Sequence, residues 1–544
     1  MSFETMLTPE WIARETDAGF WRGRVITDFL AEHAEATPDK VAFVDARRQV
    51  TYAELRAEVD RVAAGFVERG IVAGDVVSYQ LPNCIEWIVV HYAASRIGAI
   101  SNPLIPIYRE REVGFMVGLA KSKLIVVPKD FRGFDYPEMI GRLQEQWDFE
   151  PEVLVLGESS WDDFVATPWE EKASAVALDA LRPDANDVTL LIFTSGTTGE
   201  PKGVMHTHNT MVAANDPLPE RLGITSDSVL HMASTLAHLT GFLYGARLNV
   251  QNGATCVLQE VWDAAAFVEL VEQHGITYTS AATPFLHDLV TTPNLAERDT
   301  SSLVRFCCMG APIPRALVRE AKQKLPGLVV VGGWGQTEEG LVTIGIPGDP
   351  EDKIIETDGY PWPGMEIRVL DPASGAERPA GEEGALQVRG PFLFVGYAER
   401  LDMTRAQMVA APDNGGDWFD TGDLAYIDED GYLRISGRTK DVIIRGGENI
   451  PVAYVENVLY EHPDVANVAV VAVPDPRLQE RACACVVLNA GAPELTFAGM
   501  QDFLRDKGVA KQYWPEKLVV LDDFPKTPSG KIQKFQLREQ VAVS

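Results

Sequence analysis

One ten-residue stretch, TSGTTGEPKG at positions 194–203, constrains the chain more than any other feature. It combines four hydroxyl side chains, three glycines and one lysine: Thr194, Ser195, Thr197, Thr198, Gly196, Gly199, Gly203 and Lys202. Glycines let backbone N–H groups approach an anion closely, hydroxyls donate to its oxygens, and a lysine supplies a point charge. The apolar, β-branched run at 188–193 predicts a buried strand directly before these residues. The stretch therefore predicts a triphosphate-binding loop, and it differs from the Walker loop, which needs a glycine five residues before Gly-Lys-Ser/Thr.

The composition limits what such a chain can bind. At 544 residues it is long enough for more than one domain. Its net charge of −31 argues against a broad surface for nucleic acid or anionic lipid. The N-terminus lacks a basic segment followed by an apolar one, and no uncharged apolar run reaches membrane-spanning length. We therefore expect neither a signal peptide nor a membrane span.

The cysteines indicate the compartment. Six of them are too few for a disulfide scaffold in a chain of this length. Neither the adjacent pair Cys307 and Cys308 nor the pair Cys483 and Cys485 has the spacing of zinc ligands. We predict that all six are reduced and mostly buried, which suits a cytoplasmic protein.

Helical and strand patterns alternate along most of the chain. A capped helix is predicted from Thr51 to about residue 69, a strand at 76–79 and a helix at 85–97. Further strands are predicted at 123–127, 152–156 and 254–258, with helical stretches between them. This alternation predicts an α/β fold of layered, largely parallel sheets.

The C-terminal third changes character twice. Short strands separated by Gly, Pro and Asp turns predict a β-rich subdomain at about 365–435. Helices at 452–461 and 496–506 with strands at 465–473 and 482–488 then predict a compact α+β unit. We place the domain boundary between a large N-terminal domain, residues 1–438, and a small C-terminal domain, residues 439–544.

Three further motifs carry polar chemistry. The sequence WGQTE at 334–338 follows an apolar strand at 328–331, which predicts a turn where α/β folds place ligands. Asp423 in FDTGDL precedes Arg438 in SGR by fifteen residues. Near the C-terminus, PKTPSGK ends at Lys531. A loop of this composition can present a long side chain to a site on another domain.

Together with the phosphate loop, these motifs resemble the adenylate-forming enzymes, which include acyl-CoA ligases, peptide-synthetase adenylation domains and firefly luciferases. The resemblance runs from about residue 21 to about residue 538. It implies that Thr194, Ser195, Gly196, Thr197, Thr198, Gly199 and Lys202 bind phosphates, and that Gly310, Ala311, Pro312 and Trp334 line the adenine. It also implies that Thr337 binds the α-phosphate, Glu338 holds Mg²⁺, and Asp423 and Arg438 bind the ribose.

Two positions depart from the family pattern. Trp334 stands where tyrosine is usual, so the π face is kept but the hydroxyl is lost. Glu339 adds a second carboxylate, which would repel phosphate unless it turns away. A strand-ending turn with an incidental acid is the competing interpretation of this motif.

The resemblance also implies a mobile C-terminal lid. Lys440 stands at the hinge position, Gly446 and Gly447 flank the pantetheine tunnel for CoA, and Lys531 bridges the carboxylate and the α-phosphate. A lysine there would neutralise charge that develops on both reacting partners. The alternative for Lys440 is a solvated charge in a linker, and for Gly446 and Gly447 it is a hairpin turn. The alternative for Lys531 is a solvated lysine in the C-terminal tail.

The same resemblance indicates an acyl pocket. His238 stands where an aromatic residue or histidine gates this pocket, and a core histidine is the alternative. The implied pocket wall is small and apolar, with no basic side chain: Thr240, Gly241, Tyr244, Met309, Gly310, Gly333, Gly335, Leu341 and Val342. Leu239 stands near the position of an acid that pairs with the ammonium of amino-acid substrates, so it argues against an amino acid. We predict an uncharged acid of medium size, either a short- to medium-chain fatty acid or an alicyclic or aryl acid.

The predicted function is therefore an ATP-dependent acyl-CoA ligase of fatty acid metabolism that uses ATP, Mg²⁺ and coenzyme A. The first alternative is an adenylating enzyme that loads a carrier protein in trans. The second is a luciferase-like oxidative enzyme. The third is a non-catalytic nucleotide-binding or scaffolding protein, which would be free to lose at least one of the motif residues.

Overall fold

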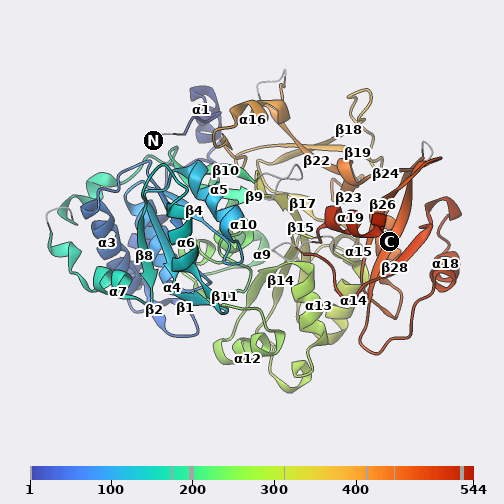
Figure 1. Ribbon diagram of the computed structural model, residues 1–544, viewed down its shortest axis with the longest axis horizontal. Coiled ribbons are helices and arrows are strands. Elements are labelled where there is room, and N and C mark those ends of the chain that lie inside the picture. The colour runs from blue at the N-terminus through green and yellow to red at the C-terminus, as the bar shows by residue number, and fades with distance from the viewer. Residues whose placement is uncertain are drawn as a thin grey trace.

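The computed structural model describes residues 3–172, 175–194, 201–311, 313–411, 415–445, 448–526 and 532–543. The described residues form four main sheets, which we name I to IV, and helices that cover them (Figure 1). Sheet I has, in spatial order, β17 (Tyr360–Pro361), β16 (Gly340–Ile344), β15 (Val329–Gln336), β14 (Arg305–Met309), β13 (Tyr278–Ala281), β11 (Val229–Met232), β12 (Thr255–Leu258), β1 (Val41–Val44) and β2 (Gln49–Thr51). Its centre is parallel and both edges are antiparallel.

Sheet II is built in the same way, with a parallel body and an antiparallel edge. Its order is β20 (Gly396–Tyr397), β10 (Lys202–Thr207), β9 (Val188–Thr194), β4 (Ile100–Pro103), β3 (Val76–Tyr79), β5 (Leu124–Pro128) and β8 (Glu152–Leu156). A separate hairpin joins β6 (Asp130–Phe131) to β7 (Phe134–Asp135).

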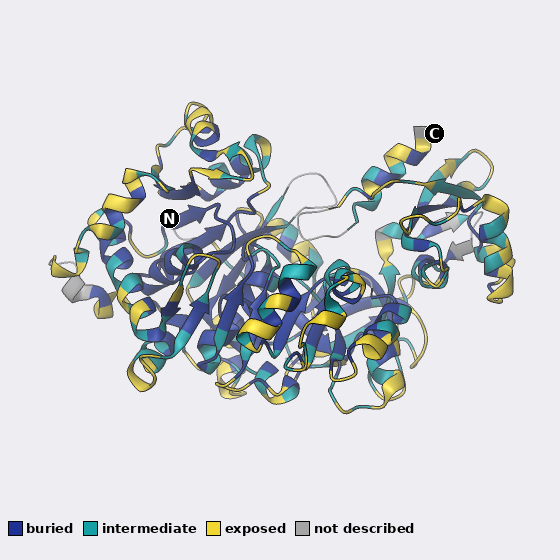
Figure 2. Ribbon diagram, turned by 90° about the horizontal axis from the view of Figure 1, so that it is seen from below, coloured by how far each residue is buried: buried dark blue, intermediate teal, exposed yellow. Residues whose placement is uncertain are grey.

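The helices of this part of the chain lie between and outside sheets I and II. They are α1 (Pro9–Asp17), α2 (Ile26–Ala36), α3 (Tyr52–Glu68), α4 (Ile85–Arg96), α5 (Glu110–Ala120), α6 (Tyr136–Gln144), α7 (Ser159–Ala166), α8 (His208–Asn215), α9 (Leu218–Leu222), α10 (Leu239–Tyr244), α11 (Leu248–Asn252), α12 (Ala264–His274), α13 (Thr283–Thr291), α14 (Arg315–Lys324), α15 (Glu351–Glu356) and α16 (Leu401–Gln407). Figure 2 shows dark, buried strands inside and helices with exposed outer faces around them.

Helix α3 illustrates why these elements form. Thr51 Oγ1 accepts a hydrogen bond from Glu54 N over 3.2 Å, and Glu54 Oε2 accepts one from Thr51 N over 2.8 Å. This capping box satisfies two backbone donors that a helix start leaves without partners. The helical period then buries one apolar face, Leu55, Val59, Val62 and Phe66. Both the cap and the face match the sequence prediction.

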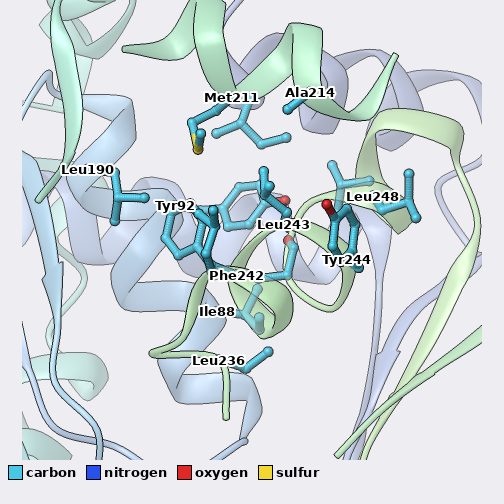
Figure 3. Packing of buried hydrophobic residues seen from close by; sticks show 14 of the residues in the cluster. Ile88, Tyr92, Leu190, Met211, Ala214, Leu236, Phe242, Leu243, Tyr244 and Leu248 are labelled. Atoms are coloured by element: carbon cyan, nitrogen blue, oxygen red, sulfur yellow. Dashed lines mark hydrogen bonds between the residues drawn. The ribbon is translucent and has the colours of Figure 1, made fainter. Parts of the chain in front are cut away.

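The main core fills the space between the two large sheets. In Figure 3, Ile88 and Tyr92 from α4, Met211 from α8 and Phe242 from α10 pack against one another beside Leu190 of β9. Each of these side chains is fully buried. Burial of a large apolar side chain contributes roughly 1.5–3 kcal/mol. The core therefore holds sheet II, which carries both ends of the predicted phosphate loop, firmly against sheet I, which carries the WGQTE motif.

Sheet III is the β-rich subdomain. It is antiparallel, with the order β18 (Glu366–Leu370), β19 (Gly384–Arg389), β22 (Trp418–Ile427) and β21 (Met408–Val409), and β23 (Leu433–Arg438) also pairs with β22. The β-rich subdomain that the turn-rich sequence predicts at about 365–435 matches this sheet.

Sheet IV belongs to the small C-terminal unit, which lies at one end of the molecule in Figure 1. Its order is β25 (Glu448–Ile450), β24 (Ile443–Arg445), β27 (Gln479–Leu488) and β26 (Val465–Asp475), with β28 (Lys517–Val520) beside β27. Helices α17 (Val452–Tyr460) and α18 (Phe497–Asp506) pack on one face, and α19 (Lys534–Val543) packs on the other. Cys483 and Cys485 point together toward α19, as their spacing along a strand requires.

These features confirm the predicted fold class, an α/β protein with a large N-terminal part, a β-rich subdomain and a small α+β C-terminal unit. All six cysteines are free and buried, as predicted. Across the described residues, no helix has both the length and the apolar character needed to cross a membrane. The exact domain boundary near residue 438 stays a prediction.

Candidate active site

The predicted phosphate loop comes between two strands that pair antiparallel. Thr194 ends β9 and lies directly opposite Lys202, which begins β10. The intervening Ser195, Gly196, Thr197, Thr198 and Gly199 lie outside the described residues. The predicted buried strand before the loop is present, because β9 is buried along most of its length. The strand pairing thus fixes both ends of the loop at one edge of sheet II.

Lys202 lies beside an aromatic residue that the sequence analysis missed. Strand β20 pairs with β10, so Tyr397 is the cross-strand partner of Val204. The Lys202 ammonium nitrogen lies 4.7 Å from the centroid of the Tyr397 ring. The dipeptide that contains Tyr397 has no composition typical of a phosphate site, so only the strand order reveals its position.

Tyr397 also contacts the predicted metal ligand. Its hydroxyl donates to Glu338 Oε1 over 2.8 Å, and Phe394 N donates to the Glu338 carbonyl oxygen over 2.6 Å. Burial, and secondly the neighbouring Glu338 charge, raise the pKa of Tyr397, so it stays a donor. Lys202, Tyr397 and Glu338 are therefore brought together from β10, β20 and the turn after β15.

Glu338 suits a Mg²⁺ ion that arrives with a nucleotide. Within the described ranges, no group of three or more His, Cys, Asp or Glu side chains could hold a metal alone. Mg²⁺ in nucleotide sites is typically bound through one or two carboxylates, substrate phosphates and water. A single carboxylate at this position fits that chemistry. When bound, the ion would neutralise phosphate charge beside Glu338.

A buried histidine holds the turn that carries Thr337. His206 Nε2 lies 2.7 Å from the Thr337 carbonyl oxygen. Since the carbonyl can only accept, Nε2 carries the proton. Burial lowers the pKa of His206 to about 4, so the ring is neutral at physiological pH. Sequence reasoning did not find His206, whose only signal is a position four residues after Lys202 along a buried strand.

The structure corrects the predicted local structure around Trp334. Strand β15 does not end at residue 331 but continues through Gln336, and only residues 337–339 form the turn. The strand continues because β16 pairs with it, with Trp334 opposite Thr343 and Gln336 opposite Gly340. The two glycines before Trp334 therefore lie inside a strand rather than in a turn.

Asp423 and Arg438, the two residues predicted to bind the ribose, lie side by side in the structure. They are register partners on β22 and β23, with Arg438 Nε 2.9 Å from Asp423 Oδ1. Asp423 Oδ2 accepts from Trp334 Nε1 over 2.9 Å and from Gln336 Nε2 over 3.0 Å. The carboxylate thus joins sheet III to the edge of sheet I.

Glu339 does not face the surface beside Glu338. Its side chain is completely buried. Burial, and then the nearby charges of Glu338 and Asp423, raise the pKa of this carboxyl well above its ordinary value. Because Glu339 faces inward and its raised pKa favours the neutral form, it does not present a second carboxylate to a phosphate beside Glu338.

Gly310 and Ala311, which are predicted to line the adenine, follow β14, the strand next to β15. Met309 is the register partner of Gly333, so Gly310 and Ala311 follow β14 beside Trp334. Gly310 has φ of +82°, a left-handed conformation that favours glycine. Pro312 lies outside the described residues.

A cavity of about 180 Å³ opens near this strand edge. Four of the predicted acyl-pocket residues line it, namely His238, Thr240, Met309 and Gly310. His238 is half-buried and caps α10, with its Nδ1 accepting from Thr240 N over 3.4 Å. The remaining lining residues are Pro82, Ile105, Pro106, Ile107, Phe131, Arg132, Ala233, Ser234, Thr235, Glu260, Val261, Trp262, Ala282 and Phe285.

The cavity lining differs from the predicted pocket wall in two ways. Gly241, Tyr244, Gly333, Gly335, Leu341 and Val342 are not among its lining residues. Tyr244 packs in the main core, as Figure 3 shows. Conversely, the predicted wall has no basic side chain, whereas the cavity includes Arg132 and Glu260, both exposed. Arg132 lies in the β6–β7 hairpin with φ of +56°, far in sequence from the motifs.

The residues implied for the lid are described only in part. Lys440 lies in a 3-10 helix, Thr439–Asp441, that follows β23. Its side chain, together with Gly446, Gly447 and Lys531, lies outside what the structure describes. Their hinge, CoA-binding and catalytic roles stay predictions.

Comparison with known proteins identifies the class. The family model for AMP-binding enzymes matches residues 30–398, and the model for their C-terminal domain matches residues 454–531. The medium-chain fatty-acid–CoA ligase of Escherichia coli K12 is 36% identical over 96% of this chain and 91% of its own. The salicyl-AMP ligase / salicyl-S-ArCP synthetase of Mycobacterium tuberculosis is 33% identical over 97% of this chain and 92% of its own.

A solved structure agrees with these sequence matches. ATP-bound MatB from Rhodopseudomonas palustris superposes with a TM-score of 0.85 at 28% identity, covering 95% of this chain and 99% of that one. The chain belongs to the AMP-binding enzymes, the adenylate-forming superfamily. The predicted enzyme class, an AMP-forming acid–thiol ligase of the acyl-CoA ligase type, is thereby confirmed.

Proposed function

We propose that this protein is an ATP-dependent acyl-CoA ligase for an uncharged carboxylic acid of medium size. The observation that carries the proposal is the convergence of Lys202, Tyr397 and Glu338 at one end of the phosphate loop. A cation, a hydrogen-bond donor and a metal-binding carboxylate are the groups that phosphoryl chemistry needs in one place. The cavity lined by His238 and Met309 supplies a neighbouring space for the acid.

The proposed reaction has two steps. A carboxylate oxygen of the acid attacks the α-phosphorus of ATP, the bond to pyrophosphate breaks, and an acyl-adenylate forms. A thiolate then attacks the acyl carbon, and AMP leaves with the carboxylate oxygen. Positioning and charge neutralisation carry such steps, with little covalent help from the protein. Lys202, Thr337 and Lys531 would neutralise and hold the phosphate, while Asp423 and Arg438 would bind the ribose.

In this proposal, a rotation of the C-terminal lid prepares the site for the second step. Residues after 438 would turn about Lys440, withdraw Lys531, and bring Gly446 and Gly447 to the path of the pantetheine thiol. A hinge residue absorbs the backbone rotation when a lid changes position. Lys440 follows directly after β23, the strand that ends with Arg438, which is consistent with this role.

The proposed acid follows from the cavity and the relatives. Most of the lining is apolar, including Ile105, Phe285 and Met309. Among the described lining residues, Arg132 alone carries a permanent positive charge, and it is exposed, so leaving it unpaired costs little. Of the relatives, one is named for medium-chain fatty acids and another for salicylate. A short- to medium-chain fatty, alicyclic or aryl acid fits both observations.

Coenzyme A is the proposed acceptor, and a carrier-protein thiol is the second candidate. The second candidate is supported by the relative whose name includes an aryl carrier protein product. The first is supported by the greater identity to a CoA ligase, 36% against 33%. A cytoplasmic location suits either acceptor, since all six cysteines are free.

The test measures pyrophosphate release with ATP and Mg²⁺ across acids from acetate to palmitate, with cyclohexane-type, benzoic, cinnamic and amino acids. Each acid is assayed with CoA, with a holo-carrier protein, and with neither thiol. We expect release to peak at an uncharged acid of medium size and acyl-CoA to form from it. Thioester formed only on the carrier would overturn CoA as acceptor, and no acid-dependent release would overturn the proposed function.

A further inference from the structure

The indole of Trp334 makes a contact that the resemblance does not account for. The family role places the aromatic face at this position against adenine. In this chain the nitrogen at the ring edge also donates to Asp423 Oδ2 over 2.9 Å. The contact is buried, because Trp334 is 8% exposed and Asp423 is 3% exposed. A hydrogen bond from a fixed donor to a charged group is among the stronger hydrogen bonds in proteins, so this contact helps to set the geometry of the carboxylate.

Gln336 adds a second donor to the same oxygen. Residues two apart on a strand point to the same side, so Trp334 and Gln336 both face Asp423 from β15. Gln336 Nε2 donates to Asp423 Oδ2 over 3.0 Å and to the Thr421 carbonyl oxygen over 3.0 Å. Because both partners can only accept, the amide nitrogen must face them and the side-chain orientation is fixed.

The other carboxylate oxygen is left available. Asp423 Oδ1 lies 2.9 Å from Arg438 Nε as an ion pair, yet it accepts no hydrogen bond from any described residue. Arg438 supplies charge but is half exposed, so it can move when a ligand enters. Among the described residues, two donors fix Oδ2, whereas only the half-exposed Arg438 lies beside Oδ1, so Oδ1 is the oxygen that can accept a hydrogen bond from a ligand.

We propose that Trp334 and Gln336 are positioning residues that hold Asp423 so that Oδ1 recognises a ribose hydroxyl of the nucleotide. Trp334 thus supplies, at a position where tyrosine is usual, an N–H donor directed at the predicted ribose ligand Asp423. The inference rests on the proposed function for the role of Asp423. It adds that nucleotide sugar selectivity depends on two side chains that do not touch the sugar.

The experiment compares binding of ATP, 2′-deoxy-ATP and 3′-deoxy-ATP by calorimetry, without acid or thiol so that no turnover occurs. Trp334→Phe keeps an aromatic face and removes only the N–H donor. Gln336→Leu keeps the size and removes the second donor, and serves if the first variant does not fold. Trp362→Phe is the matched control, because the buried Trp362 Nε1 has no hydrogen-bond partner among the described residues.

We expect wild type and Trp362→Phe to bind ATP more tightly than at least one deoxy analogue. The selectivity is the ratio of the Kd for the deoxy analogue to the Kd for ATP. We expect Trp334→Phe and Gln336→Leu each to lower this ratio by about five-fold or more, through weaker binding of ATP itself. A ratio unchanged in both variants would overturn the inference, and so would an equal loss for all three nucleotides, which indicates lost stacking or general damage. Failure of wild type to bind ATP would instead contradict the proposed function.

Discussion

The Tyr397 hydroxyl donates a hydrogen bond to Glu338 Oε1 over 2.8 Å and so connects strand β20 to the turn after β15. The same ring lies beside the Lys202 ammonium group, 4.7 Å from ring centroid to nitrogen. One tyrosine therefore contacts both Lys202 and Glu338, the charged side chains to which the proposed function assigns phosphate and Mg²⁺ binding. This contact links sheet II to the edge of sheet I at the candidate active site.

Removal of that hydroxyl tests the contact. We expect Tyr397→Phe to slow acid-dependent pyrophosphate release about ten-fold, because loss of a hydrogen bond to a charged group costs about 1.5–3 kcal/mol. The Mg²⁺ dependence of the rate measures the effect on Glu338. Tyr432→Phe is the control, since its hydroxyl bonds Asp349 away from the site. Equal rates in Tyr397→Phe and wild type would contradict a positioning role.

Lys531 has the most specific predicted role. We expect Lys531→Ala to lose adenylate formation far more than thioester formation from a supplied acyl-adenylate, because its charge acts on the carboxylate and α-phosphate. The two half-reactions are measured separately. Lys526→Ala is the control, because Lys526 pairs with Asp523. Equal losses in both half-reactions would refute the role.

Gly335 is required by close backbone approach. A Cβ at this position would fall 1.8 Å from the Gly340 carbonyl oxygen on the paired strand. We expect Gly335→Ala to force β15 and β16 apart, to lower the free energy of unfolding by about 1–3 kcal/mol and to abolish pyrophosphate release. Gly327→Ala is the control, because no atom lies within 4 Å of its added Cβ. Urea unfolding measures the stability, and the pyrophosphate assay measures the activity. A fully active and stable Gly335→Ala would contradict the prediction, because β15 and β16 would then accommodate the added methyl group.

His231 makes stability depend on pH. It is buried with Thr279 Oγ1 at 3.0 Å and Gln259 Oε1 at 3.1 Å, and burial lowers its pKa to about 3. Below pH 6.5 the histidine of the unfolded chain binds a proton that the buried, folded histidine does not. The contribution of neutral His231 to the free energy of unfolding is therefore complete above pH 6.5. It falls by up to about 1.4 kcal/mol per pH unit as the pH drops toward 3.

Replacement of this histidine isolates the effect. At neutral pH we expect His231→Gln to unfold more easily than wild type, and the gap in unfolding free energy to shrink as the pH falls below 6.5. Urea titrations of both proteins over this range measure the gap. A gap that stays constant with pH would show that His231 does not titrate as its burial requires.

The parts of the fold with a clear period or cap could be predicted from sequence. The α3 cap at Thr51 and the common face of Cys483 and Cys485 are local features, so the residues themselves contain the information. Trp334 was wrongly placed in a turn, because the glycines before it are typical of turns and their pairing partner lies across the sheet. Tyr397 and Arg132 were missed because strand order and a distant hairpin, not any local pattern, bring them to the site.

The same distinction between local patterns and long-range contacts applies to the candidate site. Asp423 and Arg438 were predicted together through the family motif, and the structure makes them register partners on adjacent strands. The donors on Asp423 could not be predicted, because a bond from Trp334 spans 89 residues and two sheets. Side chains that position other side chains leave no spacing pattern in a single sequence.

The most direct test of the central claim follows the carboxylate oxygen. The protein is incubated with ATP, Mg²⁺, CoA and octanoate labelled in its carboxylate with the heavy oxygen isotope, and the products are analysed by mass spectrometry. Attack of that carboxylate on the α-phosphorus predicts one labelled oxygen in AMP, unlabelled pyrophosphate and one labelled oxygen in octanoyl-CoA. Labelled inorganic phosphate, or AMP without the label in the presence of new thioester, would contradict an acyl-adenylate and the mechanism proposed for this site.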